Sequence, residues 1–305
     1  MTDGALKVGV IGTGIMGAPM AANMAAAGWP VSGWARRREA AEAVPGITAV
    51  ADVRELASCD VLVSVLPDLP QLEDVLSGGL LEALGERGSC GEDSEGGDPG
   101  ERETAVTLVI CSTSSPTGVR ELAERLAEAG IAVVDAPISG GQKKAVEGTL
   151  AIMVGGADTD VARVLPILRA CGTPVHLGPL GSGQVAKACN QMIVSATVAA
   201  LAEATVLAER SGLDVAALFE LLSGGLAGSE VLNQKAPKLI AHDHTVSGPA
   251  KYFIKDLGFT LEQADSAGVR LDLAHHLRET WAAMTEAGYG DLDTTALQAY
   301  IEDRS

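Results

Sequence analysis

Aromatic side chains are scarce in this sequence of 305 residues: Phe, Trp and Tyr make up 3% of it, whereas 47% of the residues are hydrophobic. The core must therefore consist mainly of small aliphatic side chains and closely packed helices. Basic residues are also few, because 22 Lys and Arg stand against 40 Asp and Glu and give a net charge of −18. A surface this acidic repels phosphate backbones and anionic lipids, which disfavours nucleic-acid and membrane partners.

The sequence also lacks the cysteine patterns of metal sites. Five cysteines, an odd number, occur without Cys-x-x-Cys pairs or Cys/His spacing, so we expect no metal and a reducing compartment. The first residues contain no basic region followed by an apolar signal core, and we therefore expect a cytoplasmic protein. Most of the cysteines lie in apolar segments that predict buried thiols; the five are Cys59, Cys90, Cys111, Cys171 and Cys189.

The most informative stretch is VGVIGTGIMGAPMAANM, in which an apolar run, a glycine-rich turn and a helical pattern follow one another. This is the strand–turn–helix order of dinucleotide-binding sites. Gly12 allows the turn, Gly14 lets backbone N–H groups approach a pyrophosphate, and Gly17 lets the helix lie close to the strand. A plain turn between strand and helix is the alternative. The expected cofactor contacts are Gly12, Thr13, Gly14, Ile15, Met16 and Gly17.

The second expected strand, residues 31–34, is followed by three arginines instead of an acidic residue. NAD-specific sites place a carboxylate about 20 residues beyond the glycines to bind the ribose 2′-hydroxyl. The first acidic residue here, Glu39, comes too late for that role. We therefore predict NADP, with Arg36 and Arg37 holding its 2′-phosphate; NAD stays possible if the arginines only begin a solvated helix.

Further apolar runs alternate with helical patterns as far as residue 178. Expected strands lie at residues 47–50, 59–67, 105–110, 131–134, 150–154 and 174–177. The alternation predicts an α/β Rossmann domain with a mostly parallel sheet at residues 1–178. Leu66 and Pro67, which end the fourth strand, should then lie at the sheet's carboxyl edge beside the cofactor. The Gly-rich, acidic segment 85–104 is expected to be a surface loop.

Residues 179–305 show helical periodicity and predict an all-α domain. Its first helix, residues 184–211, is nearly all Ala, Val, Leu and Met, which predicts burial within this domain or against a partner chain. A membrane helix is the alternative, and the charges of Lys187, Glu203 and Glu209 disfavour it. The apolar helix also predicts a homodimer or homotetramer.

Several polar residues interrupt apolar segments. In DAPISGG, Ser139 offers a hydroxyl, and Gly140 and Gly141 offer bare amides, which suits a carboxylate as well as an ordinary turn. Lys187 lies one turn into the long helix, where lost hydration would let it act as an acid near neutral pH; a snorkelling lysine is the alternative. Asn190 shares its face, at i+3.

These motifs, taken in order, resemble those of the β-hydroxyacid dehydrogenase family, the relatives of 3-hydroxyisobutyrate dehydrogenase and tartronate semialdehyde reductase. The resemblance spans almost the whole chain apart from residues 85–104. It rests on VGVIGTGIMGAPMAANM, Leu66-Pro67, Ser112-Thr113, DAPISGG with EGTLAIMVGG, GSGQVAKACNQ and KDLGFTLEQADSAGV.

The resemblance implies a Rossmann domain, a helical domain led by a long interdomain helix, and hydride transfer between a nicotinamide and a small hydroxyacid in the cleft between them. It implies that Lys187 is the general acid in reduction and the general base in oxidation. By the same matching, the substrate carboxylate and hydroxyl fall to Ser139, Gly140, Gly141 and Asn190, the substrate border to Asp256, and the nicotinamide end to Thr113 and Lys255.

The chain departs from the family pattern at Lys144 and Gly248, which leaves the shape of the substrate pocket open. Two other functions are consistent with the fold. Imine reductases share this scaffold but usually lack a lysine at the position of Lys187, and a non-catalytic dinucleotide-binding protein would have no need of Lys187, Ser139 and Asn190 together. Both are therefore disfavoured.

Overall fold

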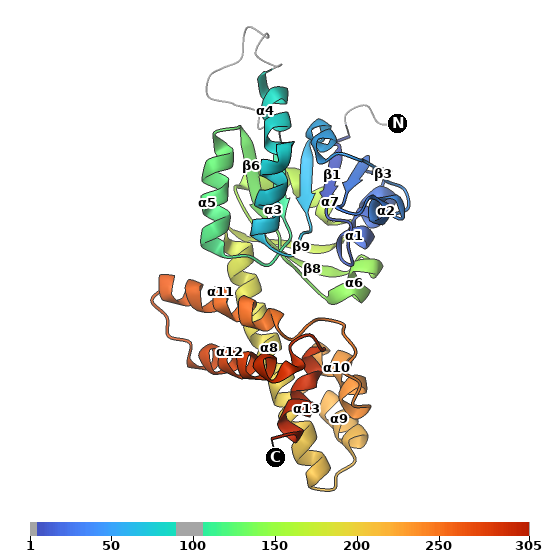
Figure 1. Cartoon of the computed structure of the whole chain (residues 1–305), viewed down its shortest axis with the longest axis vertical. Coiled ribbons are helices and arrows are strands. Elements are labelled where there is room, and N and C mark those ends of the chain that lie inside the picture. The colour runs from blue at the N-terminus through green and yellow to red at the C-terminus, as the bar shows by residue number, and fades with distance from the viewer. Residues whose placement is uncertain (1–4, 90–105, 305) are drawn as a thin grey trace. The chain divides into compact units, whose positions relative to one another are not determined.

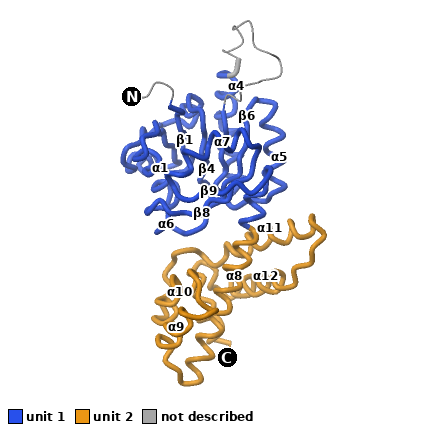
Figure 2. Tube along the Cα trace, turned by 180° about the vertical axis from the view of Figure 1, so that it is seen from behind, with its two compact units in different colours: residues 1–187 blue, residues 188–305 orange. Residues whose placement is uncertain are grey.

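The computed structural model describes residues 5–89 and 106–304, which form two compact units. Unit 1 comprises Met1–Lys187 and unit 2 comprises Ala188–Ser305, coloured blue and orange in Figure 2. The division falls inside helix α8 (Ser182–Arg210), whose first turns belong to unit 1. Each unit has its own hydrophobic core and is described separately below.

Unit 1 is built on one sheet, whose strand order over the described residues is β3-β2-β1-β4-β5-β6-β8-β7, with β9 beside β8. Neighbouring strands are parallel except where β8 pairs with β6 and with β7. This confirms the predicted Rossmann fold with a mostly parallel sheet. The strands are β1 (Val8–Ile11), β2 (Val31–Trp34), β3 (Thr48–Ala49), β4 (Val61–Ser64), β5 (Val106–Ile110), β6 (Ile131–Asp135), β7 (Ile138–Ser139), β8 (Leu150–Gly155) and β9 (Gly172–Gly178).

The central strands are almost continuously apolar because helices cover both faces of the sheet (Figure 1). Every residue of β1, β4 and β5 is buried. One core lies under α1 (Gly17–Ala26), α6 (Gly141–Glu147) and α7 (Asp158–Leu168). The core on the other face lies under η1 (Val53–Ser58), α3 (Leu69–Val75), η2 (Leu76–Leu80), α4 (Leu81–Ser89) and α5 (Pro116–Ala127), while α2 (Arg38–Glu42) follows β2.

The helical segment after β4 is irregular, and one prediction for its end needs correction. It is broken at Gly79, whose φ of 112° is incompatible with a regular helix and leaves the π-turn η2 between α3 and α4. Helix α4 also continues to Ser89, so residues 85–89 are helical and not part of a loop. The remainder of the expected loop, residues 90–104, lies outside the described residues.

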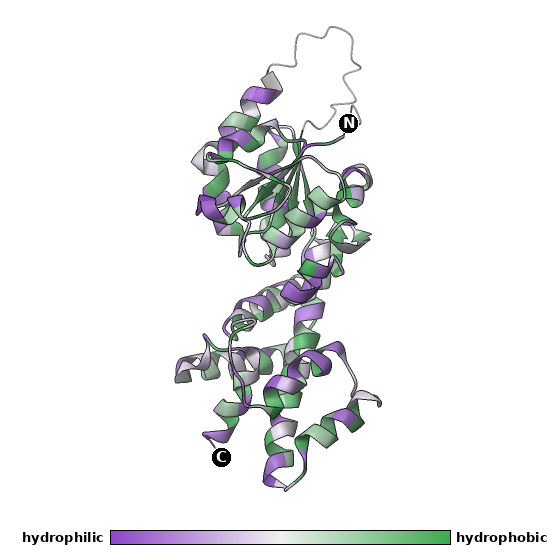
Figure 3. Cartoon of the chain, turned by 90° about the vertical axis from the view of Figure 1, so that its right-hand side faces the viewer, coloured by the Kyte–Doolittle hydropathy of each residue, from purple (hydrophilic) through white to green (hydrophobic). Residues whose placement is uncertain are grey.

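Unit 2 is helical, as predicted, and its helices carry both hydrophobic and hydrophilic surfaces (Figure 3). After α8 come α9 (Val215–Ser223), α10 (Glu230–Ile240), α11 (Tyr252–Ser266), α12 (Asp272–Met284), η3 (Thr285–Tyr289), η4 (Thr294–Ala296) and α13 (Leu297–Glu302). Trp281 is fully buried at the centre, 4.9 Å from the Phe253 ring between centroids, and its indole N–H donates to Ser195 over 2.7 Å. Trp281 is the largest of the fully buried side chains among the described residues, so it fills much of the volume of this core.

Helix α8 is long and apolar enough to cross a membrane by length and composition, with 44% of its most apolar window buried within the chain. A single helix of this kind is weak evidence for a membrane span, because the core helix of a soluble protein passes the same test.

A buried ion pair ties two segments of unit 2 together. Asp293 has no exposed surface, and it accepts hydrogen bonds from Lys235 Nζ over 2.8 Å and from the Ser247 N–H over 3.0 Å. Burial by itself would raise the pKa of Asp293, but the bonds from Lys235 and Ser247 outweigh it and hold the pKa well below its ordinary value. The ionised carboxylate is therefore the form that unit 2 requires.

We expect Lys235→Met to lower the free energy of unfolding by about 3 kcal/mol near neutral pH, because it leaves a charged carboxylate buried without its cation. Because the folded pKa of Asp293 is depressed, its stabilising contribution is complete above its unfolded value and disappears as the pH falls through the folded value. The difference between wild type and variant should therefore shrink below about pH 4. Urea unfolding at several pH values measures it.

Lys251→Met is the matched control, since Lys251 pairs with the exposed Asp291 over 2.6 Å at the surface, where water screens the pair, and its loss should hardly change the stability. Equal losses in the two variants would contradict the importance of the buried pair.

Candidate functional site

The glycine-rich turn between β1 and α1 is closed on its inner side. Gly12 has a φ of 95°, and a Cβ there would lie 2.9 Å from Leu66 Cδ2. A Cβ on Gly17 would overlap the carbonyl oxygen of Gly12. Only glycine fits these two positions, as the motif predicts.

The outer side of the same turn is open. Nothing lies within 4 Å of the place that a Cβ on Gly14 would occupy, and Gly14 and Ile15 are exposed. Helix α1 begins here with Met16 as its N-cap and has no side-chain cap, so the positive end of its dipole lies at this opening. The hydroxyl of Thr13 is buried beside it and has no hydrogen-bond partner among the residues that the structure describes. These features fit the pyrophosphate of a dinucleotide.

Arg36 and Arg37 lie just beyond the end of β2, at the same edge of the sheet as this turn. Parallel pairing puts Trp34 opposite Ile11, and the Gly12 N–H donates to the Trp34 carbonyl over 2.8 Å. Both arginines are exposed. Arg38, in contrast, is bonded to Glu42 over 2.7 Å within its own helix.

Two further predicted residue groups lie at this edge. Strands β1, β4 and β5 are in parallel register, so the segments that follow them leave the sheet side by side. Leu66 and Pro67 follow β4, and the Leu66 side chain faces Gly12. Thr113 follows β5 and is half-buried. The structure therefore brings the predicted cofactor contacts of unit 1 to one sheet edge.

Lys187 is buried, with 7% of its surface exposed, and it donates a hydrogen bond from Nζ to the Ile138 carbonyl over 2.8 Å. This contact brings two predicted segments together, because Ile138 directly precedes Ser139. Gly140 and Gly141 follow with φ values of 135° and 70°, which side chains rarely adopt, and the space beside Gly141 is open. The Lys187 Nζ thus contacts the backbone directly before Ser139, Gly140 and Gly141, within unit 1.

The remaining predicted residues lie in unit 2, on α8 and α11. Asn190 Nδ2 donates to Gln191 Oε1 over 2.9 Å, and Gln191 Nε2 donates to Asp256 over 2.6 Å. Asp256 is 6% exposed. Lys255 Nζ lies 4.0 Å from Asp256, at the limit of an ion pair. Gln191 therefore links Asn190 to Asp256. We did not single out Gln191 in the sequence, although it directly follows Asn190 in GSGQVAKACNQ.

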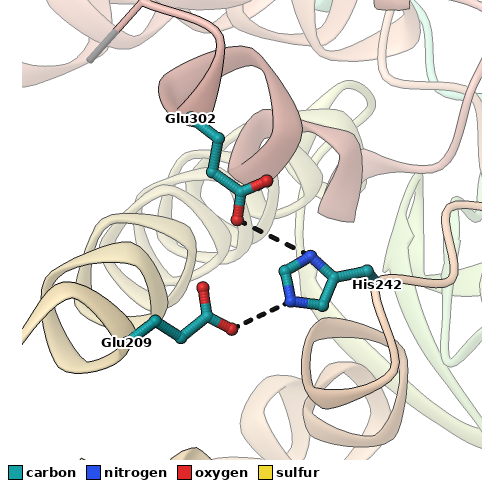
Figure 4. Close-up of side chains that lie close together, drawn as sticks. All are labelled: Glu209, His242 and Glu302. Carbon is teal, nitrogen blue, oxygen red and sulfur yellow. Dashed lines mark hydrogen bonds and ion pairs between the residues drawn. The ribbon is translucent and has the colours of Figure 1, made fainter. Parts of the chain in front are cut away.

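Within the described part of the chain, one group of side chains brings three possible metal ligands together, away from the predicted site. Figure 4 shows His242 between Glu209 of α8 and Glu302 of α13. The ring nitrogens lie 3.0 Å from the Glu209 carboxylate and 3.6 Å from that of Glu302. Because each nitrogen already faces its own carboxylate, the geometry is that of a bridging histidine. We expected no metal from the sequence, and this group could not be anticipated because its members are far apart in the chain.

Comparisons with known proteins identify the family of this chain. Residues 7–181 match a family model described as the NAD binding domain of 6-phosphogluconate dehydrogenase, and residues 181–301 match one described as NAD-binding of NADP-dependent 3-hydroxyisobutyrate dehydrogenase. The 2-hydroxy-3-oxopropionate reductase of Escherichia coli K12 is 33% identical over 300 residues, which cover 97% of each chain. The chain belongs to the β-hydroxyacid dehydrogenase family.

Solved structures place the fold in the same family. A Mycobacterium tuberculosis 3-hydroxyisobutyrate dehydrogenase with L-serine has a TM-score of 0.80 and 28% identity, and the match covers 97% of this chain and 99% of that one. An imine reductase from Pseudomonas sp., with a TM-score of 0.58, 22% identity and coverage of 96% and 98%, shares the fold alone. Members of the β-hydroxyacid dehydrogenase family bind NAD(P). Because the matched descriptions name both NAD and NADP, the choice between the two cofactors depends on this chain's own residues.

We expect Gly14→Val to fold with nearly unchanged thermal stability, because its Cβ points into open space, and to raise the Kd for NADPH by at least about tenfold, because that space is where the pyrophosphate would lie. Gly17→Ala is the contrasting variant and should lose about 3 kcal/mol, since its methyl group overlaps backbone. Thermal unfolding and NADPH titration of both variants measure this. Tight NADPH binding by a folded Gly14→Val would contradict the assignment of the turn.

Proposed function

We propose that this protein is an NADP-preferring dehydrogenase or reductase that transfers hydride between nicotinamide C4 and the carbinol or carbonyl carbon of a small β-hydroxyacid or its semialdehyde. The observation that carries the proposal is the buried Lys187 ammonium, 2.8 Å from the Ile138 carbonyl and next to Ser139. A buried cation that contacts the backbone directly before Ser139, Gly140 and Gly141 suits a substrate that carries both a carboxylate and a carbonyl.

The bound dinucleotide supplies or accepts the hydride. In reduction, Lys187 donates a hydrogen bond to the substrate carbonyl oxygen, polarises it and gives a proton to the developing alkoxide. In oxidation, the neutral amine takes that proton back. Because Lys187 is buried, water screens its charge less than it would at the surface.

The other predicted residues orient the substrate and the cofactor in this proposal. The Ser139 hydroxyl and the N–H groups of Gly140 and Gly141 hold the substrate carboxylate. Asn190 binds the substrate hydroxyl, and Asp256 borders the substrate. Thr113 and Lys255 contact the nicotinamide end of the cofactor. The names of the relatives, 2-hydroxy-3-oxopropionate reductase and 3-hydroxyisobutyrate dehydrogenase, support a small substrate that carries a carboxylate.

We expect Lys187→Ala to lower kcat about 10³-fold, because the variant loses the proton donor, while the Kd for NADPH changes less than about twofold. The assay offers 2-hydroxy-3-oxopropionate with NADPH, and 3-hydroxyisobutyrate and L-serine with NADP⁺. Lys143→Ala, at an exposed position near the same segment, is the control and should keep its activity. Equal turnover by wild type and Lys187→Ala would refute the proposed role, and turnover of an imine but none of the three acids would favour imine reduction instead.

We expect wild-type protein to bind NADPH more tightly than NADH, and Arg36→Ala to lose about 1.5–3 kcal/mol of NADPH binding, the size of a charged hydrogen bond, with little change for NADH. Arg38→Ala, whose guanidinium is bonded to Glu42, is the matched control. Titration followed by quenching of tryptophan fluorescence measures all three proteins. Tighter binding of NADH would show that the arginines are merely solvated.

For assembly and location we propose a cytoplasmic homodimer or homotetramer without nucleic-acid or membrane partners, in line with the net charge of −18. Ile193 and Leu207 are exposed fourteen residues apart on α8 and so share one face. Leu213, Leu221 and Leu226 add exposed apolar surface in unit 2. A monomer in light scattering at micromolar concentration would contradict the assembly.

A further inference from the structure

Asp135, the last residue of β6, is a buried charge that the proposed mechanism does not use. It has no exposed surface. Its Oδ1 accepts the Gly181 N–H over 2.8 Å, and its Oδ2 accepts the Gln184 N–H over 2.7 Å. Gln184 lies in the first turn of α8, so this carboxylate caps the helix that carries Lys187. Burial raises the pKa of Asp135 to about 6, although the two amide bonds oppose the rise.

Two glycines enclose this carboxylate. A Cβ on Gly155 would overlap Oδ1 of Asp135, and a Cβ on Gly183 would lie 2.8 Å from Oδ2. Backbone therefore closes around both oxygen atoms and leaves no room for a longer side chain. The position is shaped for a side chain of this size.

Gln184 attaches the same turn of α8 to a second strand end. Its side chain is 1% exposed; Nε2 donates to the Ser112 carbonyl over 2.9 Å, and Oε1 accepts the Ser114 N–H over 3.0 Å. These two bonds flank Thr113. Both polar ends of the Gln184 amide are satisfied by backbone, which fixes the orientation of the side chain.

Lys187 depends on both attachments. It lies three residues after Gln184, on the same face of α8. The carbonyl that it contacts belongs to Ile138, three residues after Asp135. Asp135 therefore connects the two segments that meet in the Lys187–Ile138 contact. Its backbone continues to Ile138, and its carboxylate caps the helix that carries Lys187.

We propose that Asp135 and Gln184 are positioning residues of the reaction: they hold the first turn of α8 against the ends of β5 and β6, and so fix Lys187 Nζ against residues 138–141. Neither residue is assigned a contact with substrate. The inference rests on the proposed function of Lys187, but the position of that side chain can be tested without turnover.

The first test measures the access of reagent to Lys187. Reductive methylation followed by peptide mass spectrometry gives the labelling rate of Lys187 relative to that of the exposed Lys143 in the same molecule. In Asp135→Asn, the carboxamide presents an NH₂ group to one of two backbone N–H groups; in Gln184→Met, both bonds to the strand end are lost. We expect the relative rate for Lys187 to rise roughly threefold or more in both variants, as local opening of the helix start exposes it.

Asp293→Asn is the matched control, because it also alters a carboxylate without exposed surface that accepts backbone N–H bonds, but in unit 2. It should lose stability and leave the labelling of Lys187 unchanged. Unchanged labelling in Asp135→Asn and Gln184→Met would overturn the proposal. If Asp135→Asn does not fold, Gln184→Met decides it alone.

The second test is kinetic. We expect Asp135→Asn and Gln184→Met to lower kcat about 10- to 100-fold, the effect of a misplaced acid, with the Kd for NADPH within about twofold of wild type. In a Lys187→Ala background the same substitutions should lower kcat no further, because the side chain that residues 135 and 184 position is gone. If the substitutions instead damaged the fold in general, their effects on kcat would multiply with that of Lys187→Ala.

The outcomes separate the two proposals. Full activity of Lys187→Ala refutes the proposed role of Lys187 in the reaction, and the labelling experiment then still decides where the Lys187 side chain is held. Loss of activity in Lys187→Ala together with full activity in both positioning variants refutes the present inference alone.

Discussion

The parallel pairing of the central strands is the constraint on which the rest of unit 1 depends. Strands β1, β4, β5 and β6 run in the same direction and in register, so the segments after them must all leave the sheet at one edge. Each connection must also cross a face of the sheet, which covers both faces with helices and makes the strands apolar throughout. Polar groups that carry chemistry are thereby confined to the strand ends. Residues 12–17, 66–67, 112–114 and 135–141 are all segments of this kind.

The order of the strands places the cofactor turn at a particular point of that edge. The chain moves from β1 outward to β2 and β3, and then returns to the other side of β1 with β4. At such a reversal the crossover connections lie on opposite faces, and a crevice opens between them. The Gly12 turn emerges there, beside Leu66 after β4. The position of the turn thus follows from topology, while its openness follows from glycine.

Local sequence determined most of what could be predicted. Short-range patterns predict the turn at residues 12–17, the extent of β2 and the long apolar helix α8. The family motifs add residue roles. Interactions across long sequence separations leave no such pattern. The bonds from Gln184 to Ser112 and Ser114 cross about seventy residues, and Glu209, His242 and Glu302 meet only in three dimensions. The antiparallel pairing of β7 with β8 was missed for a different reason: β7 has only two residues, too few to show a strand pattern.

Asp135 illustrates the same limit. An aspartate that ends an apolar strand must either reach solvent or find hydrogen-bond donors, and the polar segment that follows Asp135 is compatible with both. Its donors are the amides at the start of α8, more than forty residues later. These partners meet only in three dimensions, so the burial of this carboxylate could not be read from the sequence.

The acidic composition bears less on cofactor choice than the net charge of −18 suggests. Charges at the surface are screened beyond about 8–10 Å at physiological ionic strength, so most of the 40 acidic residues act too far from any one phosphate to matter. What a bound anion experiences is set by groups within that distance. Beyond β2 these include Arg36 and Arg37, both exposed, whereas Arg38 is neutralised by Glu42. An acidic protein can thus favour the more highly charged of two cofactors, provided that its few cations are concentrated where the additional phosphate would lie.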